Sequence, residues 1–171
     1  MGNPKKKFGK IYDKYIDKIY RFIYLKVSSA ETAQDLTSET FMKGWDKFKA
    51  DQEAIDNPRA FLYRIAHNLV VDFYRHKGKT QIVSAEFVQL EDPRTNLEEK
   101  AKTGSDMLLI RRALATLKDD YQNVIIWHYL DDLSIKEVAA MLGKTEETTR
   151  VTLHRALKSL RTRLDKDIYL V

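Results

Sequence analysis

Apolar residues recur at intervals of three and four positions along much of this chain, a spacing typical of helices that each bury one face. The pattern predicts one helix around residues 11–23, a second over residues 30–48 and a third that begins at residues 57–58. Only six of the 171 residues are glycine and three are proline, which suits packed helices better than a many-turned β-sandwich. We therefore predict an all-α fold.

The third predicted helix has clear boundaries, and a less regular segment follows it. Asn57 and Pro58 are residue types favoured at an N-cap and at a first helical position, and Gly78 interrupts a basic run that suits a helix end. From residue 80 to 105 the helical periodicity fades, and proline, glycine and scattered acidic residues indicate an extended connection. We predict two small helical domains, residues 1–79 and 106–171, joined by a flexible linker over residues 80–105.

A helix-turn-helix is predicted in the second domain, after two short helices over residues 107–117 and 121–130. Ser134 and Glu137 have the spacing of a capping box, Gly143 permits a left-handed turn, and Thr145 is an N-cap for the next helix. That helix has an apolar face and a basic face, with no acidic residue from position 148 to position 164. Such a helix suits the major groove of DNA and its flanking phosphates.

Composition limits the classes of function that remain. The chain has no cysteine, no apolar stretch long enough to span a bilayer and no signal-peptide pattern at its start. We therefore expect a cytoplasmic protein without membrane insertion. The net charge of +5 and the pI of about 9.2 favour a polyanionic partner such as nucleic acid.

An enzyme is the main alternative, and the sequence gives it little support. The four histidines are dispersed, and a pair such as Asp72 and His76 is more typical of a helix surface than of a metal site. No glycine-rich phosphate loop or nucleophile elbow is present. We expect no catalytic residues, no metal and no cofactor. A helix-turn-helix repressor or activator that acts without RNA polymerase is a third possibility, but the patterns of the first domain argue against one.

The first domain resembles region two of the extracytoplasmic-function (ECF) group of bacterial RNA polymerase sigma factors. The similarity rests on Ala-Gln-Asp-Leu-Thr-Ser-Glu-Thr-Phe at residues 33–41, followed by Trp45. In that family this helix docks on the clamp helices of the largest subunit of core RNA polymerase. The resemblance therefore implies that Asp35, Glu39 and Thr40 contact polymerase.

Residues 57–68, Asn-Pro-Arg-Ala-Phe-Leu-Tyr-Arg-Ile-Ala-His-Asn, resemble the start of the family's helix that captures the opened minus-ten element. The loop over residues 49–57 corresponds to the segment that holds a flipped-out base of the non-template strand. The resemblance implies that the minus-ten contacts come from Tyr63, Arg64, Asn68, Asp72 and Arg75. Tyr63 and Tyr74 are also aromatic candidates for stacking on exposed bases.

The second domain resembles region four, which reads the minus-thirty-five element. Residues 113–117, the helix-turn-helix and Leu-His-Arg-Ala at residues 153–156 carry the similarity. The implied DNA contacts on the second helix are Thr148, Arg150, Val151, His154, Arg155 and Lys158. Arginine can donate to guanine edges or phosphates, and Val151 can contact a thymine methyl group.

The chain departs from the family pattern in this recognition helix. Where the family commonly has Gly-Thr-Val-Lys-Ser-Arg, residues 147–152 are Glu-Thr-Thr-Arg-Val-Thr. Glu147 replaces a glycine and Thr152 an arginine, so we expect weaker attraction to phosphates but a stable first helical turn. Lys118 and Asp119 also stand where a proline often follows Leu117, a difference expected to affect local rigidity more than function.

From this resemblance we expect a sigma factor that binds core RNA polymerase, directs it to promoter DNA and promotes strand opening. The family also implies control by an anti-sigma factor that masks the same surfaces.

Overall fold

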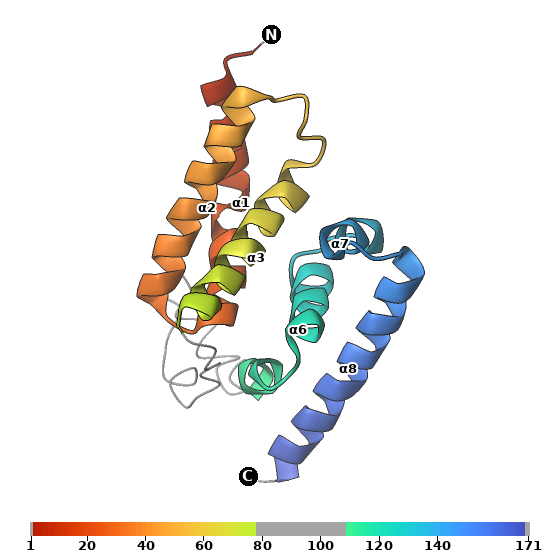
Figure 1. Ribbon diagram of the computed structural model, residues 1–171. Coiled ribbons are helices and arrows are strands. Elements are labelled where there is room, and N and C mark those ends of the chain that lie inside the picture. The colour runs from red at the N-terminus through yellow and green to blue at the C-terminus, as the bar shows by residue number, and fades with distance from the viewer. Residues whose placement is uncertain (1, 78–108, 170–171) are drawn as a thin grey trace. The chain divides into compact units, whose positions relative to one another are not determined.

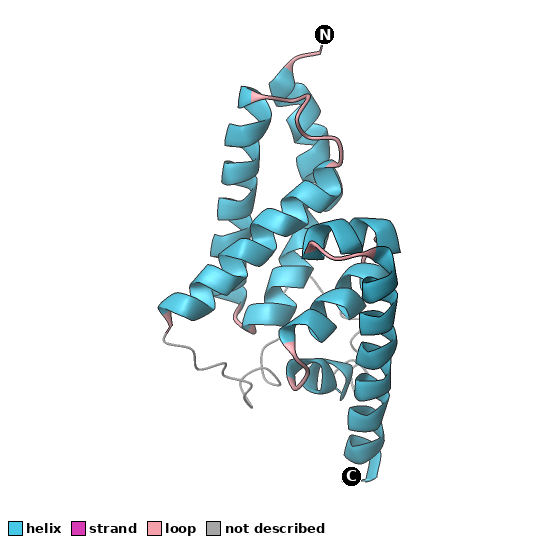
Figure 2. Cartoon of the chain, turned by 45° about the vertical axis from the view of Figure 1, so that its right-hand side comes forward, coloured by secondary structure: helices cyan, strands magenta, loops and turns pink. Residues whose placement is uncertain are grey.

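The computed structural model describes residues 2–77 and 109–169, and within these ranges the regular structure is entirely helical (Figures 1 and 2). The all-α prediction is confirmed, with two helical domains. The chain divides into two compact units, Met1–Ile82 and Val83–Val171. The predicted linker, residues 80–105, lies outside the described residues.

The first unit is a bundle of α1 (Pro4–Val27), α2 (Ala30–Ala50) and α3 (Pro58–His76), each in contact with the other two (Figure 1). Helix α1 begins earlier than its apolar pattern predicts. Asn3 accepts a hydrogen bond from the Lys5 amide at 3.0 Å, and Pro4 occupies the first helical position. This is the same Asn-Pro start that opens α3, where Asn57 accepts from the Ala60 amide at 3.1 Å.

Aromatic side chains hold the start of α1 against the end of α2. The ring centroid of Phe8 lies 5.4 Å from that of Trp45 and 5.4 Å from that of Phe48. Nearby, Gly44 is buried at the contact between helices, where a Cβ atom would lie 3.0 Å from Leu62 Cδ2. At the other end of the bundle the Tyr74 hydroxyl donates to the Lys26 carbonyl and joins α3 to α1.

The second unit contains a helix over residues 109–115, α6 (Asp119–Ile125), the π-helix η1 (Ile126–Leu130), α7 (Ile135–Leu142) and α8 (Glu146–Tyr169). The sequence predicts one regular helix over residues 121–130, but the backbone widens at Ile126. The Asp131 amide donates to the Ile126 carbonyl, five residues earlier, at 3.0 Å. This wider turn accompanies the almost complete burial of Trp127.

Helices α7 and α8 form the predicted helix-turn-helix. The Ser134 hydroxyl and the Glu137 carboxylate accept from each other's backbone amides, as a capping box requires. Gly143 has φ of 66°, the left-handed conformation that glycine adopts without strain, and the Lys144 amide donates to the Ala139 carbonyl at 3.0 Å. Thr145 then accepts from the Thr148 amide at 3.1 Å and starts α8.

Candidate functional site

The outer face of α2 is where contact with polymerase is predicted. Asp35 and Glu39 are exposed and lie one helical turn apart, and Glu39 forms an exposed ion pair with Lys43 at 3.5 Å. Met42 lies seven residues after Asp35, so it shares this face, and its side chain is 68% exposed. Sequence analysis missed Met42, although the seven-residue spacing was visible. The face therefore combines two carboxylates with an exposed apolar side chain.

Thr40 does not belong to this face, and the prediction that it contacts polymerase is corrected. Its side chain is 0% exposed, and its hydroxyl donates to the Leu36 carbonyl at 2.7 Å. The position follows the inward spacing of Phe41 and Gly44, both of which are also buried. Thr40 thus helps to pack α2 against the bundle and has no surface for a partner.

The minus-ten candidates lie on α3, and most of them share its exposed side. Arg64, Asn68, Asp72 and Arg75 are exposed, at steps of three and four residues that place them along one face. Asp72 and Arg75 form an ion pair at 3.8 Å. The face presents cationic groups beside an amide that can both donate and accept hydrogen bonds, a combination suited to phosphates and base edges.

Tyr63 is a second correction. Its ring is 0% exposed and meets Phe22 edge to face with the centroids 5.7 Å apart, so it offers no surface on which a base can stack. Among the aromatic candidates Tyr74 is half-buried, with its hydroxyl bonded to α1. The buried position of Tyr63 follows from its neighbours Leu62 and Ala66, which also face the core.

The outer face of α8 carries the predicted minus-thirty-five contacts. Its inner side buries Thr149, Leu153 and Ala156. On the opposite side of the helix, all of the predicted contacts are exposed: Thr148, Arg150, Val151, His154, Arg155 and Lys158. Val151 is 44% exposed, an apolar patch within a cationic surface.

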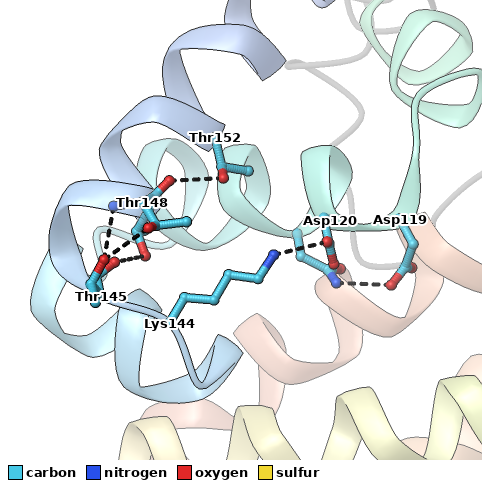
Figure 3. A network of polar contacts seen from close by, with 8 residues as sticks. Asp119, Asp120, Lys144, Thr145, Thr148 and Thr152 are labelled. Carbon is cyan, nitrogen blue, oxygen red and sulfur yellow. Dashed lines mark hydrogen bonds and ion pairs between the residues drawn. The ribbon is translucent and has the colours of Figure 1, made fainter.

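The start of α8 is held by a network of short polar contacts (Figure 3). The Thr145 hydroxyl donates to the Thr148 hydroxyl at 2.8 Å, and the Thr149 and Thr152 hydroxyls donate to the carbonyls of Thr145 and Thr148. In the turn between α7 and α8, Lys144 forms an ion pair with Asp120 of α6 at 3.3 Å. Sequence analysis identified Thr145 as a cap but missed its bond to Thr148.

The departures from the family pattern take up exposed or half-buried positions. Glu147 is exposed in the first turn of α8, where a negative charge interacts favourably with the helix dipole. Thr152 is half-buried, and its hydroxyl bonds to its own helix. Lys118 follows Leu117 where the family often has proline, and the next residue, Asp119, accepts from the Asn123 side chain at 3.2 Å at the start of α6.

Within residues 2–77 and 109–166, no three histidine or acidic side chains are grouped so that they hold a metal ion. Among the described helices, none combines the length and the apolar character needed to cross a bilayer.

Comparison with known families matches both units. The model of Sigma-70 region 2 matches residues 11–80, and the model of Sigma-70 region 4 matches residues 107–160. The first match contains α2, α3 and the loop between them, and the second contains the helix-turn-helix.

Relatives from Bacillus subtilis and Streptomyces coelicolor match almost the whole chain. The chain is 30% identical to the RNA polymerase sigma factor YlaC of Bacillus subtilis, over 91% of this chain and 91% of the relative. It is 30% identical to the ECF RNA polymerase sigma factor SigW of the same organism, over 92% and 88%. It is 29% identical to the ECF RNA polymerase sigma factor BldN of Streptomyces coelicolor over 94% of this chain, and it spans 61% of the length of that relative.

Solved structures share the fold. The sigma factor RpoE, crystallised with the anti-sigma factor NepR from Bartonella quintana, has a TM-score of 0.72 and 23% identity over 94% of this chain and 98% of that one. CnrH, in complex with the cytosolic domain of CnrY, has a TM-score of 0.71 and 23% identity over 97% and 92%. The chain belongs to the ECF group of the sigma-70 family of RNA polymerase sigma factors.

Proposed function

We propose that this protein is a promoter-recognition subunit that binds core RNA polymerase through α2, reads the minus-thirty-five element with α8 and holds the opened non-template strand on α3. The observation that carries this proposal is the presence of three exposed polar faces on helices that match regions two and four. In this role the chain supplies binding energy to a polymerase that performs the chemistry, so it needs no catalytic group. It acts in the cytoplasm, where polymerase and promoter meet.

The α2 face supports docking on a cationic or amphipathic helical surface. Asp35 and Glu39 are exposed carboxylates, and Met42 adds apolar area that gains free energy when a partner covers it. We propose that the clamp helices of the largest polymerase subunit cover this face. Long-range attraction by the carboxylates speeds the encounter, while burial of Met42 slows dissociation.

The α8 face supports duplex binding. Arg150, Arg155 and Lys158 neutralise phosphates and release counterions, which supplies affinity that depends on salt rather than on sequence. The α3 face supports capture of a single strand, since Arg64 and Arg75 can pair with its phosphates while Asn68 bonds a base edge. Binding of the opened strand on α3 stabilises the melted state relative to the duplex, so strand opening is driven by binding energy.

Regulation by an anti-sigma factor is part of the proposal. Both structural neighbours were solved with a bound partner, which in the RpoE structure is named an anti-sigma factor. We propose that a partner of this kind covers the α2 face with Met42 at its centre, because an inhibitor that buries this face competes directly with core polymerase.

The experiment is reconstitution of transcription with purified core RNA polymerase. We expect the full chain to form a holoenzyme that initiates from DNA sites selected from a random pool. Asp35→Arg should abolish co-elution with core while the circular dichroism spectrum stays unchanged, because Asp35 is exposed. Asp13→Arg, a charge reversal at an exposed site on α1, is the matched control and should bind normally. If the unaltered chain fails to bind core polymerase, the proposal is wrong.

A further inference from the structure

The threonines of α8 and its N-cap Thr145 use their hydroxyl groups in different ways. Thr149, Thr152 and Thr162 donate to carbonyls four residues earlier, at 2.8, 2.9 and 3.0 Å. Thr145 donates to the Thr148 oxygen at 2.8 Å (Figure 3). Among the described residues, the Thr148 hydroxyl pairs with that of Thr145 and, unlike those of Thr149 and Thr152, bonds to no backbone carbonyl, and its side chain is exposed. With Thr145 as the donor in this pair, Thr148 can donate outward.

The direction of this chain of hydrogen bonds has a physical cause. The Thr145 oxygen already accepts from the Thr148 amide at 3.1 Å, and this polarises its own hydroxyl as a donor toward Thr148. Donation in the same direction along successive groups is cooperative, so donation from Thr145 to Thr148 is favoured over the reverse. Thr145 thus acts as a positioning residue that makes Thr148 a donor toward DNA.

The side chains near Thr148 determine which hydrogen-bond acceptor on DNA it can approach. Glu146 and Glu147 are exposed in the same turn, and their carboxylates disfavour a phosphate oxygen at this point. One turn later Val151 lies on the same side of the helix, with its Cβ about 5–6 Å from that of Thr148. A hydroxyl donor therefore stands beside an exposed apolar side chain.

We infer that Thr148 and Val151 together read a thymine in the minus-thirty-five element, with Thr148 donating to thymine O4 and Val151 contacting the 5-methyl group. In the major groove thymine is the base that presents an acceptor beside a methyl group. Cytosine presents an amino donor at the position of O4, which faces the Thr148 proton unfavourably. Guanine and adenine offer acceptors but no methyl group for Val151. This specificity rests on the proposed function of α8 as the duplex-reading helix.

The test uses holoenzyme assembled from core polymerase and the full chain, on DNA sites selected from a random pool. We expect one minus-thirty-five position where thymine is strongly favoured. Cytosine there should weaken binding roughly tenfold, because a buried donor faces a donor. Deoxyuridine, which lacks only the methyl group, should weaken it about fourfold.

Matched variants assign the two contacts. Val151→Ala should remove the penalty for deoxyuridine but keep the preference over cytosine, and Thr148→Val should lose that preference whereas Thr148→Ser keeps it. Thr145→Asp retains an N-cap but accepts the Thr148 proton, so the ratio of thymine to cytosine binding should fall, while Thr145→Ser should preserve it.

The outcomes separate this inference from the proposed function. A holoenzyme that binds its selected sites without a position favouring thymine over both cytosine and deoxyuridine overturns the thymine contact alone. An unchanged deoxyuridine penalty in Val151→Ala overturns the role of Val151, and an unchanged preference in Thr145→Asp overturns the positioning role of Thr145. A chain that forms no holoenzyme removes both proposals.

Discussion

Ser134 and Glu137 satisfy each other's backbone at the start of the helix-turn-helix: the Ser134 hydroxyl accepts from the Glu137 amide at 3.1 Å, and the Glu137 carboxylate accepts from the Ser134 amide at 3.1 Å. Helix α7 spans only eight residues, so it depends on its cap more than a long helix would. We expect Ser134→Ala to lower the free energy of unfolding of the second unit by about 1 kcal/mol.

The measurement is urea denaturation followed by tryptophan fluorescence. The chain has two tryptophans, and a Trp45→Phe background leaves Trp127 as the reporter of the second unit. Ser134→Thr keeps a hydroxyl at the cap and should cost much less. Equal losses for the alanine and threonine variants would show that the capping hydroxyl does not stabilise α7.

Thr40 tests the boundary of the polymerase-binding face. Because its side chain is 0% exposed, Thr40→Val should leave the affinity for core polymerase within about twofold of the unaltered chain, while losing one hydrogen bond worth about 1 kcal/mol. Glu39→Ala, one residue earlier and exposed, should weaken that affinity. Both affinities can be measured by fluorescence anisotropy of the labelled chain. A large loss of binding in Thr40→Val, with the fold intact, would return Thr40 to the interface.

The two corrected site residues, Thr40 and Tyr63, lie on the expected helices but on the buried face of each. The sequence predicts these helix boundaries well, because each signal depends only on residues close to it in the chain. Asn57-Pro58 and the Ser134 capping box mark helix starts, and Gly143 marks a helix end. The same Asn-Pro signal at Asn3 lies ahead of the apolar pattern, so the pattern alone does not predict this helix start. Burial of Tyr63 and the π-turn at Ile126 depend on packing between helices, which no local pattern specifies. All of the α8 candidates are exposed, because the apolar stripe of this helix faces the core and the candidates lie off that stripe.

Tyr63 tests whether a buried ring contributes to strand capture. We expect Tyr63→Ala to lower the free energy of unfolding of the first unit by about 3–5 kcal/mol, the usual cost of deleting a large aromatic side chain from a core. Tyr63→Phe keeps the ring and should keep most of that stability. Denaturation followed by Trp45 fluorescence in a Trp127→Phe background measures both. If Tyr63→Phe also keeps promoter opening in a permanganate assay while Asn68→Ala loses it, the strand contact lies on the exposed face.

Substitution of Arg155 measures how much attraction to phosphates contributes to the affinity for duplex DNA. We expect Arg155→Ala to weaken binding of the holoenzyme to minus-thirty-five duplexes and to reduce the slope of log affinity against log salt concentration by about 1. Arg112→Ala removes an exposed arginine from the helix at residues 109–115 and serves as the control, with no expected change in slope. The slopes are obtained by measuring the affinity of each holoenzyme for the duplex across a range of salt concentrations. A slope unchanged by Arg155→Ala would place this guanidinium away from phosphate.

The close approach of Gly44 and Leu62 sets the distance between the two helices that are proposed to bind polymerase and DNA. Helix α2 carries the carboxylates proposed to meet polymerase, helix α3 carries the groups proposed to hold the strand, and the two helices meet where a Cβ atom would be 3.0 Å from Leu62. A larger residue at position 44 would push these helices apart without altering a single side chain on either binding face. If the two faces act as proposed, the spacing between the polymerase-binding face and the strand-binding face therefore depends on a residue that belongs to neither.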